Sequence, residues 1–237
     1  MPRRLLISLP PLAVNEIFGP TFQGEGPSAG RRAWFLRLTG CNLACTWCDT
    51  PYTWDWTLYN KREETHLWQI GPLLDQLSPM HRTDLLVITG GEPLLQRKAL
   101  ADLIKMMLIR LNDIEVETNG TVDPREVGTV GFSKVRFNVS PKLANSGSPS
   151  TIHPWFLANQ HRCIFKFVCR QPSDLAEIKR RFPELKNDRV WIMPEGTDTT
   201  TLLKTAQTLE GALLWDFPGW NLTLRTQILL WNTQRGH

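Results

Sequence analysis

The feature that most constrains the fold of this chain is the placement of polar or glycine-rich motifs directly after short apolar runs. Five such motifs are CNLACTWCDT, TGGEP, ETNG, SPK and MPEG. Amphipathic stretches separate the apolar runs, and this alternation predicts βα units that form a parallel sheet. The loops that follow the strands of a parallel βα barrel form the rim of its active site. We therefore expect the α/β class and a partial, TIM-like βα barrel, with the active site at the C-terminal ends of the parallel strands.

Hydrophobic periodicity and residue preferences locate the elements of this barrel. Strands are expected at 33–38, 85–89, 114–117, 135–139, 163–168, 190–193 and 222–224. Helices are expected at 100–111, where apolar residues recur every three or four positions, and at 172–182 and 201–213. The segment 51–64 is rich in Trp, Tyr and charge and has neither period, so it is expected to be a loop or lid. A chain of 237 residues with these strands has room for an incomplete barrel.

Composition and charge argue against several other classes of protein. Hydrophobic residues make up 41% and charged residues 21% of the chain. These values are typical of a globular protein, and we expect one domain over 1–237 with a loose N-terminal extension over 1–13. No apolar run approaches the roughly 20 residues that cross a bilayer, and the stretch 5–9 is too short for a signal peptide. We therefore expect a cytoplasmic location without membrane association, and the scattered net charge of +4 does not predict nucleic-acid binding.

Three of the five cysteines lie within eight residues, at Cys41, Cys45 and Cys48. In a cytosolic chain such clustering indicates a metal site. Four cysteines normally saturate a 4Fe-4S cluster, so three would leave one iron open for a reactant. A structural zinc site would need a fourth Cys or His at a suitable spacing, which this run lacks. Cys163 and Cys169 lie in the apolar run CIFKFVC and are expected to be buried thiols outside the site.

The run Cys41-Asn-Leu-Ala-Cys45-Thr-Trp-Cys48 resembles the cysteine motif of the radical S-adenosylmethionine superfamily, and Thr89-Gly-Gly-Glu-Pro93 resembles its second hallmark. The resemblance implies a 4Fe-4S cluster whose open iron chelates S-adenosylmethionine. One electron would cleave the sulfonium to give methionine and a 5′-deoxyadenosyl radical, which abstracts hydrogen from the substrate. The glycines allow close backbone approach, and Glu92 offers a carboxylate to the ligand's ammonium group. The implied S-adenosylmethionine contacts are Trp47, Cys48, Asp49, Gly91, Glu92, Ser140, Pro141 and Lys142.

A narrower resemblance extends over nearly the whole chain. It rests on the segment Asn15 to Gly26 with its run Gln-Gly-Glu-Gly, on Arg37-x-x-Gly40-Cys41, on Cys48-Asp-Thr50 and on Ser140-Pro-Lys142. Together these resemble the 7-carboxy-7-deazaguanine synthases. That family rearranges 6-carboxy-5,6,7,8-tetrahydropterin to 7-carboxy-7-deazaguanine and releases ammonia, in the biosynthesis of 7-deazapurines such as the queuosine precursor. The resemblance also implies magnesium, a homodimer and an electron donor such as flavodoxin or ferredoxin.

Substrate contacts are expected mainly from the segment before the first predicted strand. Arg37 supplies a planar fork for the ring carboxylate, and the alternative is a structural ion pair on its strand. The resemblance implies that Thr50 ligates magnesium, with the substrate carboxylate and water completing the oxygen ligands that this cation prefers. The expected substrate-binding residues are Phe22, Gln23, Gly24, Glu25, Arg37 and Thr89.

Several other polar residues follow predicted strands. Glu117 and Asn119 either bind the adenosine ribose or bind nothing, and Lys166 and Glu195 are expected to be charges of the barrel interior. Relatives often carry Gln-x-His shortly before a final Leu-Leu-Trp, whereas this chain has Arg-x-Gln beginning at Arg225. The substrate contacts from this end of the chain are therefore expected to differ, and a changed substrate stays open.

Two other functions compete with this interpretation. A radical activase would use the same cluster to abstract hydrogen from a glycine of a partner protein, but it has no evident need for the Gln-Gly-Glu-Gly run or Arg37. An iron-sulfur protein that only relays electrons would need four ligands to protect its cluster. Both alternatives are disfavoured by the combination of motifs.

Overall fold

The apolar runs of the sequence form the strands of one sheet in the computed structural model, which describes residues 10–111, 113–130, 133–232 and 234–236. The strands are β1 Leu12–Phe22, β2 Arg32–Leu38, β3 His66–Trp68, β4 Leu85–Gly90, β5 Asp113–Thr118, β6 Val135–Val139, β7 Cys163–Cys169, β8 Val190–Pro194 and β9 Asn221–Leu222. Within the described ranges they pair in the order β3-β1-β2-β4-β5-β6-β7-β8-β9.

Parallel pairing dominates this sheet. Each pair from β2–β4 to β8–β9 is parallel, whereas β1 is antiparallel to both β2 and β3. All the predicted strands occur, with ends that differ by at most two residues from the expected ones. The arrangement confirms the predicted α/β class and the partial, TIM-like barrel.

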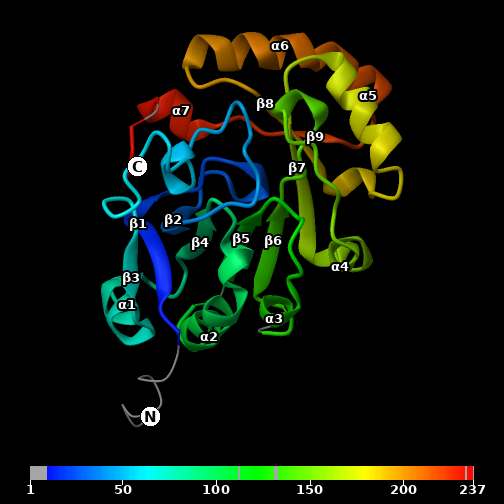
Figure 1. Ribbon diagram of the computed structural model, residues 1–237. Coiled ribbons are helices and arrows are strands. Elements are labelled where there is room, and N and C mark those ends of the chain that lie inside the picture. The colour runs from blue at the N-terminus through cyan, green and yellow to red at the C-terminus, as the bar shows by residue number, and fades with distance from the viewer. Residues whose placement is uncertain (1–9, 112, 131–132, 233, 237) are drawn as a thin grey trace.

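Helices connect the parallel strands, and α2, α3, α5 and α6 lie along the outside of the sheet (Figure 1). Their bounds are α1 Ile70–Gln76, α2 Arg97–Met107, α3 Arg125–Gly128, α4 Pro154–Ala158, α5 Pro172–Arg181, α6 Thr199–Asp216 and α7 Thr226–Trp231. The three predicted helices correspond to α2, α5 and α6. None of the helices in the described ranges is long and apolar enough to span a bilayer.

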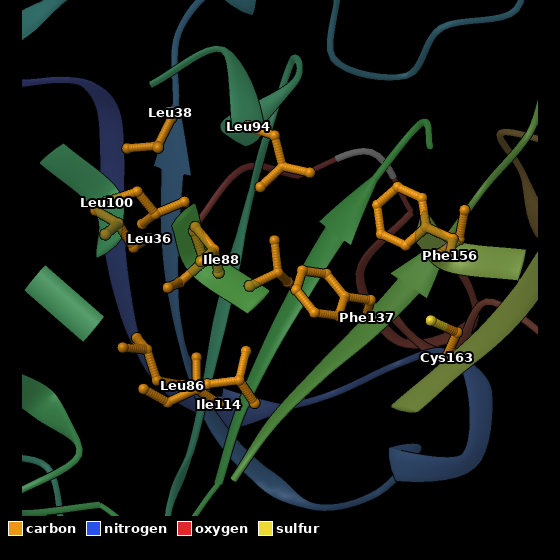
Figure 2. Packing of buried hydrophobic residues seen from close by; sticks show 14 of the residues in the cluster. Leu36, Leu38, Leu86, Ile88, Leu94, Leu100, Ile114, Phe137, Phe156 and Cys163 are labelled. Atoms are coloured by element: carbon orange, nitrogen blue, oxygen red, sulfur yellow. The ribbon is translucent and has the colours of Figure 1, made fainter. Parts of the chain in front are cut away.

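Alternation along the strands separates an apolar outer layer from a more polar interior. Leu36, Leu86 and Ile88 face the helices and belong to the main core cluster with Leu100 of α2 (Figure 2). Residues of the opposite face at the C-terminal ends of the strands are polar or border the cavity described below. They are Arg37, Thr89, Glu117, Asn138, Lys166 and Met193.

The N-terminal part of the chain departs from expectation. Leu12 and Ala13 belong to β1, so the predicted loose extension over 1–13 is wrong for these two residues; 1–9 lie outside the described residues. Gln96 fixes the start of β1, because its side-chain oxygen accepts from the Ala13 backbone N–H at 2.7 Å. Much of β1 is only half buried, and its sequence contains Gly19-Pro20. The sequence of β1 therefore lacks the alternation of apolar and polar residues by which a strand is identified.

Candidate active site

The loops after the parallel strands surround a cavity of about 610 Å³. This volume lies within the range of small-molecule sites. Most of the site residues expected from the sequence line it, although they come from segments far apart in the chain. These are Phe22, Gln23, Gly24, Glu25, Arg37, Cys41, Cys45, Trp47, Cys48, Asp49, Thr50, Thr89, Gly91, Ser140 and Lys142. Glu92 and Pro141 are not among the lining residues.

The cysteine loop after β2 is held by two neighbouring loops. The Asn42 side-chain oxygen accepts from the Asn119 side chain at 2.8 Å, which ties the loop to the ETNG motif after β5. On its other side, the Trp47 indole N–H donates to the Asn145 backbone oxygen at 3.1 Å. From the sequence, Asn119 is expected either to bind the adenosine ribose or to bind nothing. In the structure it fixes the cysteine loop and also lines the cavity.

The donor set of this loop fits an iron-sulfur cluster. Cys41, Cys45 and Cys48 are free, partly exposed thiols that line one cavity. In the described part of the chain, no three His, Cys, Asp or Glu side chains are grouped to hold a metal ion. Cysteine thiolates are the ligands that a 4Fe-4S cluster takes, and three of them would leave one ligand position for a reactant. Burial raises the pKa of the Cys41 thiol to about 11, so bound iron would have to stabilise its thiolate.

The glycine-rich motif packs directly against the cysteine loop. A Cβ on Gly91 would collide with the Gly40 carbonyl oxygen and approach the Cys41 Cβ to 2.9 Å. The next backbone N–H, that of Glu92, donates to the Gly40 oxygen at 2.7 Å. Glycine is therefore required at position 91 because the two segments are in backbone contact, and this contact sets the position of Cys41.

Glu92 joins two neighbouring segments of the rim. Its side chain is fully buried and accepts from the backbone N–H groups of Leu94 at 2.9 Å and Asn119 at 2.7 Å, and from the Thr118 hydroxyl at 2.9 Å. These bonds fasten the turn after β4 to the end of β5. The expectation that this carboxylate meets the ammonium group of S-adenosylmethionine stays a prediction.

On the opposite wall, Arg37 makes the structural ion pair that the sequence left open as one of its two roles, and its binding of a substrate carboxylate stays a prediction. Arg37 lines the cavity and also pairs with Glu16 of β1, with 2.6 Å between Nε and Oε1. Its guanidinium lies 5.9 Å from the centre of the Phe18 ring. The Nε side of the Arg37 guanidinium is thus held by β1.

The interior charges are more central than the sequence suggested. Lys166 of β7 pairs with Glu25 and lies 3.6 Å from Glu117 of β5, and all three line the cavity. Burial would raise the pKa of Glu25, but Lys166 and Arg225 lower it to about 2. The two-residue alternation of CIFKFVC, in which Lys166 shares a face with Ile164 and Val168, is the signal that places this lysine inside the barrel.

The C-terminal segment closes one side of the cavity. Arg225 pairs with Asp49 of the cysteine loop, and the Gln227 amide donates to Glu25 at 2.6 Å. The Gln227 side chain also occupies the space where any Cβ on Gly24 would lie, which explains that glycine. The residues that replace Gln-x-His in this chain therefore belong to the site.

Comparison with known proteins agrees with this geometry. Residues 36–146 match the family model described as the Radical SAM superfamily. A 7-carboxy-7-deazaguanine synthase from Pyrobaculum aerophilum is 35% identical over 96% of this chain and 98% of its own length. The synthase of Halobacterium salinarum is 31% identical over 94% and 91% of the two chains.

A solved structure is similar as well. The crystal structure of QueE from Escherichia coli matches with a TM-score of 0.65 and 25% identity, covering 90% of this chain and 93% of that one. None of these similarities supports the activase alternative. On the full-length likeness to the synthases, this chain belongs to the 7-carboxy-7-deazaguanine synthase family of the radical S-adenosylmethionine superfamily.

Proposed function

We propose that this protein converts 6-carboxy-5,6,7,8-tetrahydropterin to 7-carboxy-7-deazaguanine and ammonia. One observation carries the proposal: the Gln23-Gly24-Glu25 loop and the three clustered cysteines line the same cavity. A radical generated beside the cysteines would then meet a substrate bound by this loop without diffusing through water. Family membership and the motifs after β2 and β4 support the same reaction.

In this proposal Cys41, Cys45 and Cys48 hold a 4Fe-4S cluster. When bound, the cluster and S-adenosylmethionine supply the 5′-deoxyadenosyl radical that abstracts hydrogen from the substrate. Lys142 is half-buried beside Ser140, with 2.9 Å between its Nζ and the serine oxygen, and can neutralise a ligand carboxylate there. The remaining S-adenosylmethionine contacts are assigned to seven residues, all of which line the cavity except Glu92 and Pro141: Trp47, Cys48, Asp49, Gly91, Glu92, Ser140 and Pro141.

The substrate is assigned to the wall formed by β1, β2 and the loop between them. Ionised Glu25 accepts from the N–H groups on the pyrimidine edge of a pterin, and Gln23 offers both a donor and an acceptor. Arg37 provides its remaining N–H groups for the ring carboxylate. Phe22, Gly24 and Thr89 complete this wall.

Other partners follow from the same proposal. Thr50 provides one oxygen ligand for Mg²⁺, and the substrate carboxylate and water provide the others. A flavodoxin or ferredoxin supplies the electron. The protein acts in the cytoplasm as a homodimer.

The test is an anaerobic reaction with reconstituted protein, S-adenosylmethionine, dithionite, Mg²⁺ and 6-carboxytetrahydropterin. Mass spectrometry would follow 5′-deoxyadenosine and 7-carboxy-7-deazaguanine, and omission of Mg²⁺ would test its role. Formation of both products supports the proposal. Formation of 5′-deoxyadenosine without the deazaguanine would refute the substrate while leaving the radical chemistry in place.

A further inference from the structure

A chain of alternating charges crosses the cavity. Its order is Asp49, Arg225, Glu25, Lys166 and Glu117, and each neighbouring pair is an ion pair within 4 Å. The five residues come from the cysteine loop, the C-terminal segment, the β1–β2 loop, β7 and β5. Glu25 is at the centre, so it is the one acid with a cation on either side.

Lys166 occupies a fixed position in this chain. Its side chain is 6% exposed, and its ammonium group contacts Glu25 through Oε2. The other carboxylate oxygen, Oε1, accepts from the Gln227 amide at 2.6 Å. Oε1 also lies 3.5 Å from Arg225 Nε, whereas in the described residues Oε2 pairs with Lys166 and retains a second acceptor position, because a carboxylate oxygen has two lone pairs.

The cation on the other side of Glu25 has competing partners. Arg225 donates through Nη1 to the Gly196 backbone oxygen at 2.9 Å and through Nη2 to Asp49, while its Nε lies 3.5 Å from Glu25. Glu195 adds a further negative charge near Arg225. Lys166 is therefore the closer cation to Glu25, and it faces Glu117 but no other carboxylate within 4 Å in the described residues.

We propose that Lys166 is a positioning residue that keeps Glu25 ionised and aims its carboxylate at the N–H edge of the bound pyrimidine ring. This inference rests on the proposed function and assigns the recognition of that edge to a lysine-carboxylate pair. With a neutral side chain at position 166, the Glu25 carboxylate, whose side chain is 13% exposed, loses its closer cation, which favours its protonated form. A protonated Glu25 carries an O–H group, which would face an N–H group of the substrate ring. Two donors cannot form a hydrogen bond, so binding of the ring weakens.

The experiment measures the Kd of 6-carboxypterin, the oxidised form of the substrate, for holoenzyme variants by titration calorimetry. Lys166→Met is expected to weaken binding by about ten- to a hundredfold, as for loss of a charged hydrogen-bonding partner. The loss is expected to grow from about pH 8 to about pH 6, because Glu25 becomes easier to protonate. Lys166→Gln keeps a donor without the charge and provides a second variant; cluster absorbance and circular dichroism report the fold of both.

A double-mutant cycle separates positioning from general support of the fold. If Lys166 acts through Glu25, the variant carrying both Glu25→Gln and Lys166→Met binds the pterin as weakly as Glu25→Gln alone. Losses that multiply, or a Lys166→Met affinity that does not change with pH, would overturn the inference. Failure of the wild-type holoenzyme to bind the pterin would overturn the proposed function as well, whereas wild-type binding with multiplying losses overturns the inference alone.

Discussion

Glu92→Gln tests whether the carboxylate of the glycine-rich motif is structural. Burial raises the pKa of Glu92 from 4.5 to about 7, against the opposing hydrogen bonds from Asn119, Leu94 and Thr118. A carboxyl group with a raised pKa stabilises the fold fully below pH 4.5, and this contribution is lost as the pH rises through about 7. At about 1.36 kcal/mol per pKa unit, the contribution amounts to about 3 kcal/mol.

Glu92→Gln also lowers the free energy of unfolding by an amount that does not depend on pH. Glutamine has one acceptor oxygen, so its amide nitrogen would face either the Leu94 or the Asn119 backbone N–H, which now donate to opposite oxygens. One buried donor is left without a partner, at a cost of about 1–3 kcal/mol. We therefore expect Glu92→Gln to be less stable than wild type in acid, and to lose less stability as the pH rises.

The assay is urea unfolding of both proteins at equal cluster content, followed by tryptophan fluorescence between about pH 4.5 and about pH 8. The quantity compared is the difference between the two free energies of unfolding at each pH. It should change by about 3 kcal/mol in favour of the variant across this range. A difference that is independent of pH would refute the assignment of a raised pKa to Glu92 and with it the reasoning from burial.

Two further predictions concern the cysteine loop. Gly91→Ala should displace Gly40 and lower the iron content of reconstituted protein, with a destabilisation of about 1–3 kcal/mol; Gly211→Ala, in open space on α6, should keep the iron and gain about 0.5–1 kcal/mol. Normal iron binding by the Gly91 variant would contradict the backbone contact. Cys45→Ser should abolish the absorbance of the cluster and 5′-deoxyadenosine formation, whereas Cys163→Ala should retain both; an intact cluster after the first change would remove Cys45 from the ligand set.

The parallel strands and the rim could be predicted from the sequence because their signals are local. Each parallel strand is a short apolar run, and the motif that follows it lies at the same end of the sheet in every βα unit. The burial of Cys163 and Cys169 follows from the same kind of local pattern and is confirmed. The antiparallel strand β1 has no such pattern. It is stabilised as a strand by pairing with β2 on one side and β3 on the other.

The partners of each polar side chain were decided by the tertiary structure. Glu25 and Lys166 are 141 residues apart in the chain, and Asp49 and Arg225 are 176 apart, so no spacing rule connects them. From the sequence alone Glu92 is expected to face a ligand. In the structure its carboxylate accepts hydrogen bonds from Thr118 and Asn119 at the end of β5. Sequence thus determined which residues reach the rim, because strand period and loop position are local. The fold determined which of them face the cavity and which are used to hold neighbouring loops, because closure of the barrel brings distant strands together.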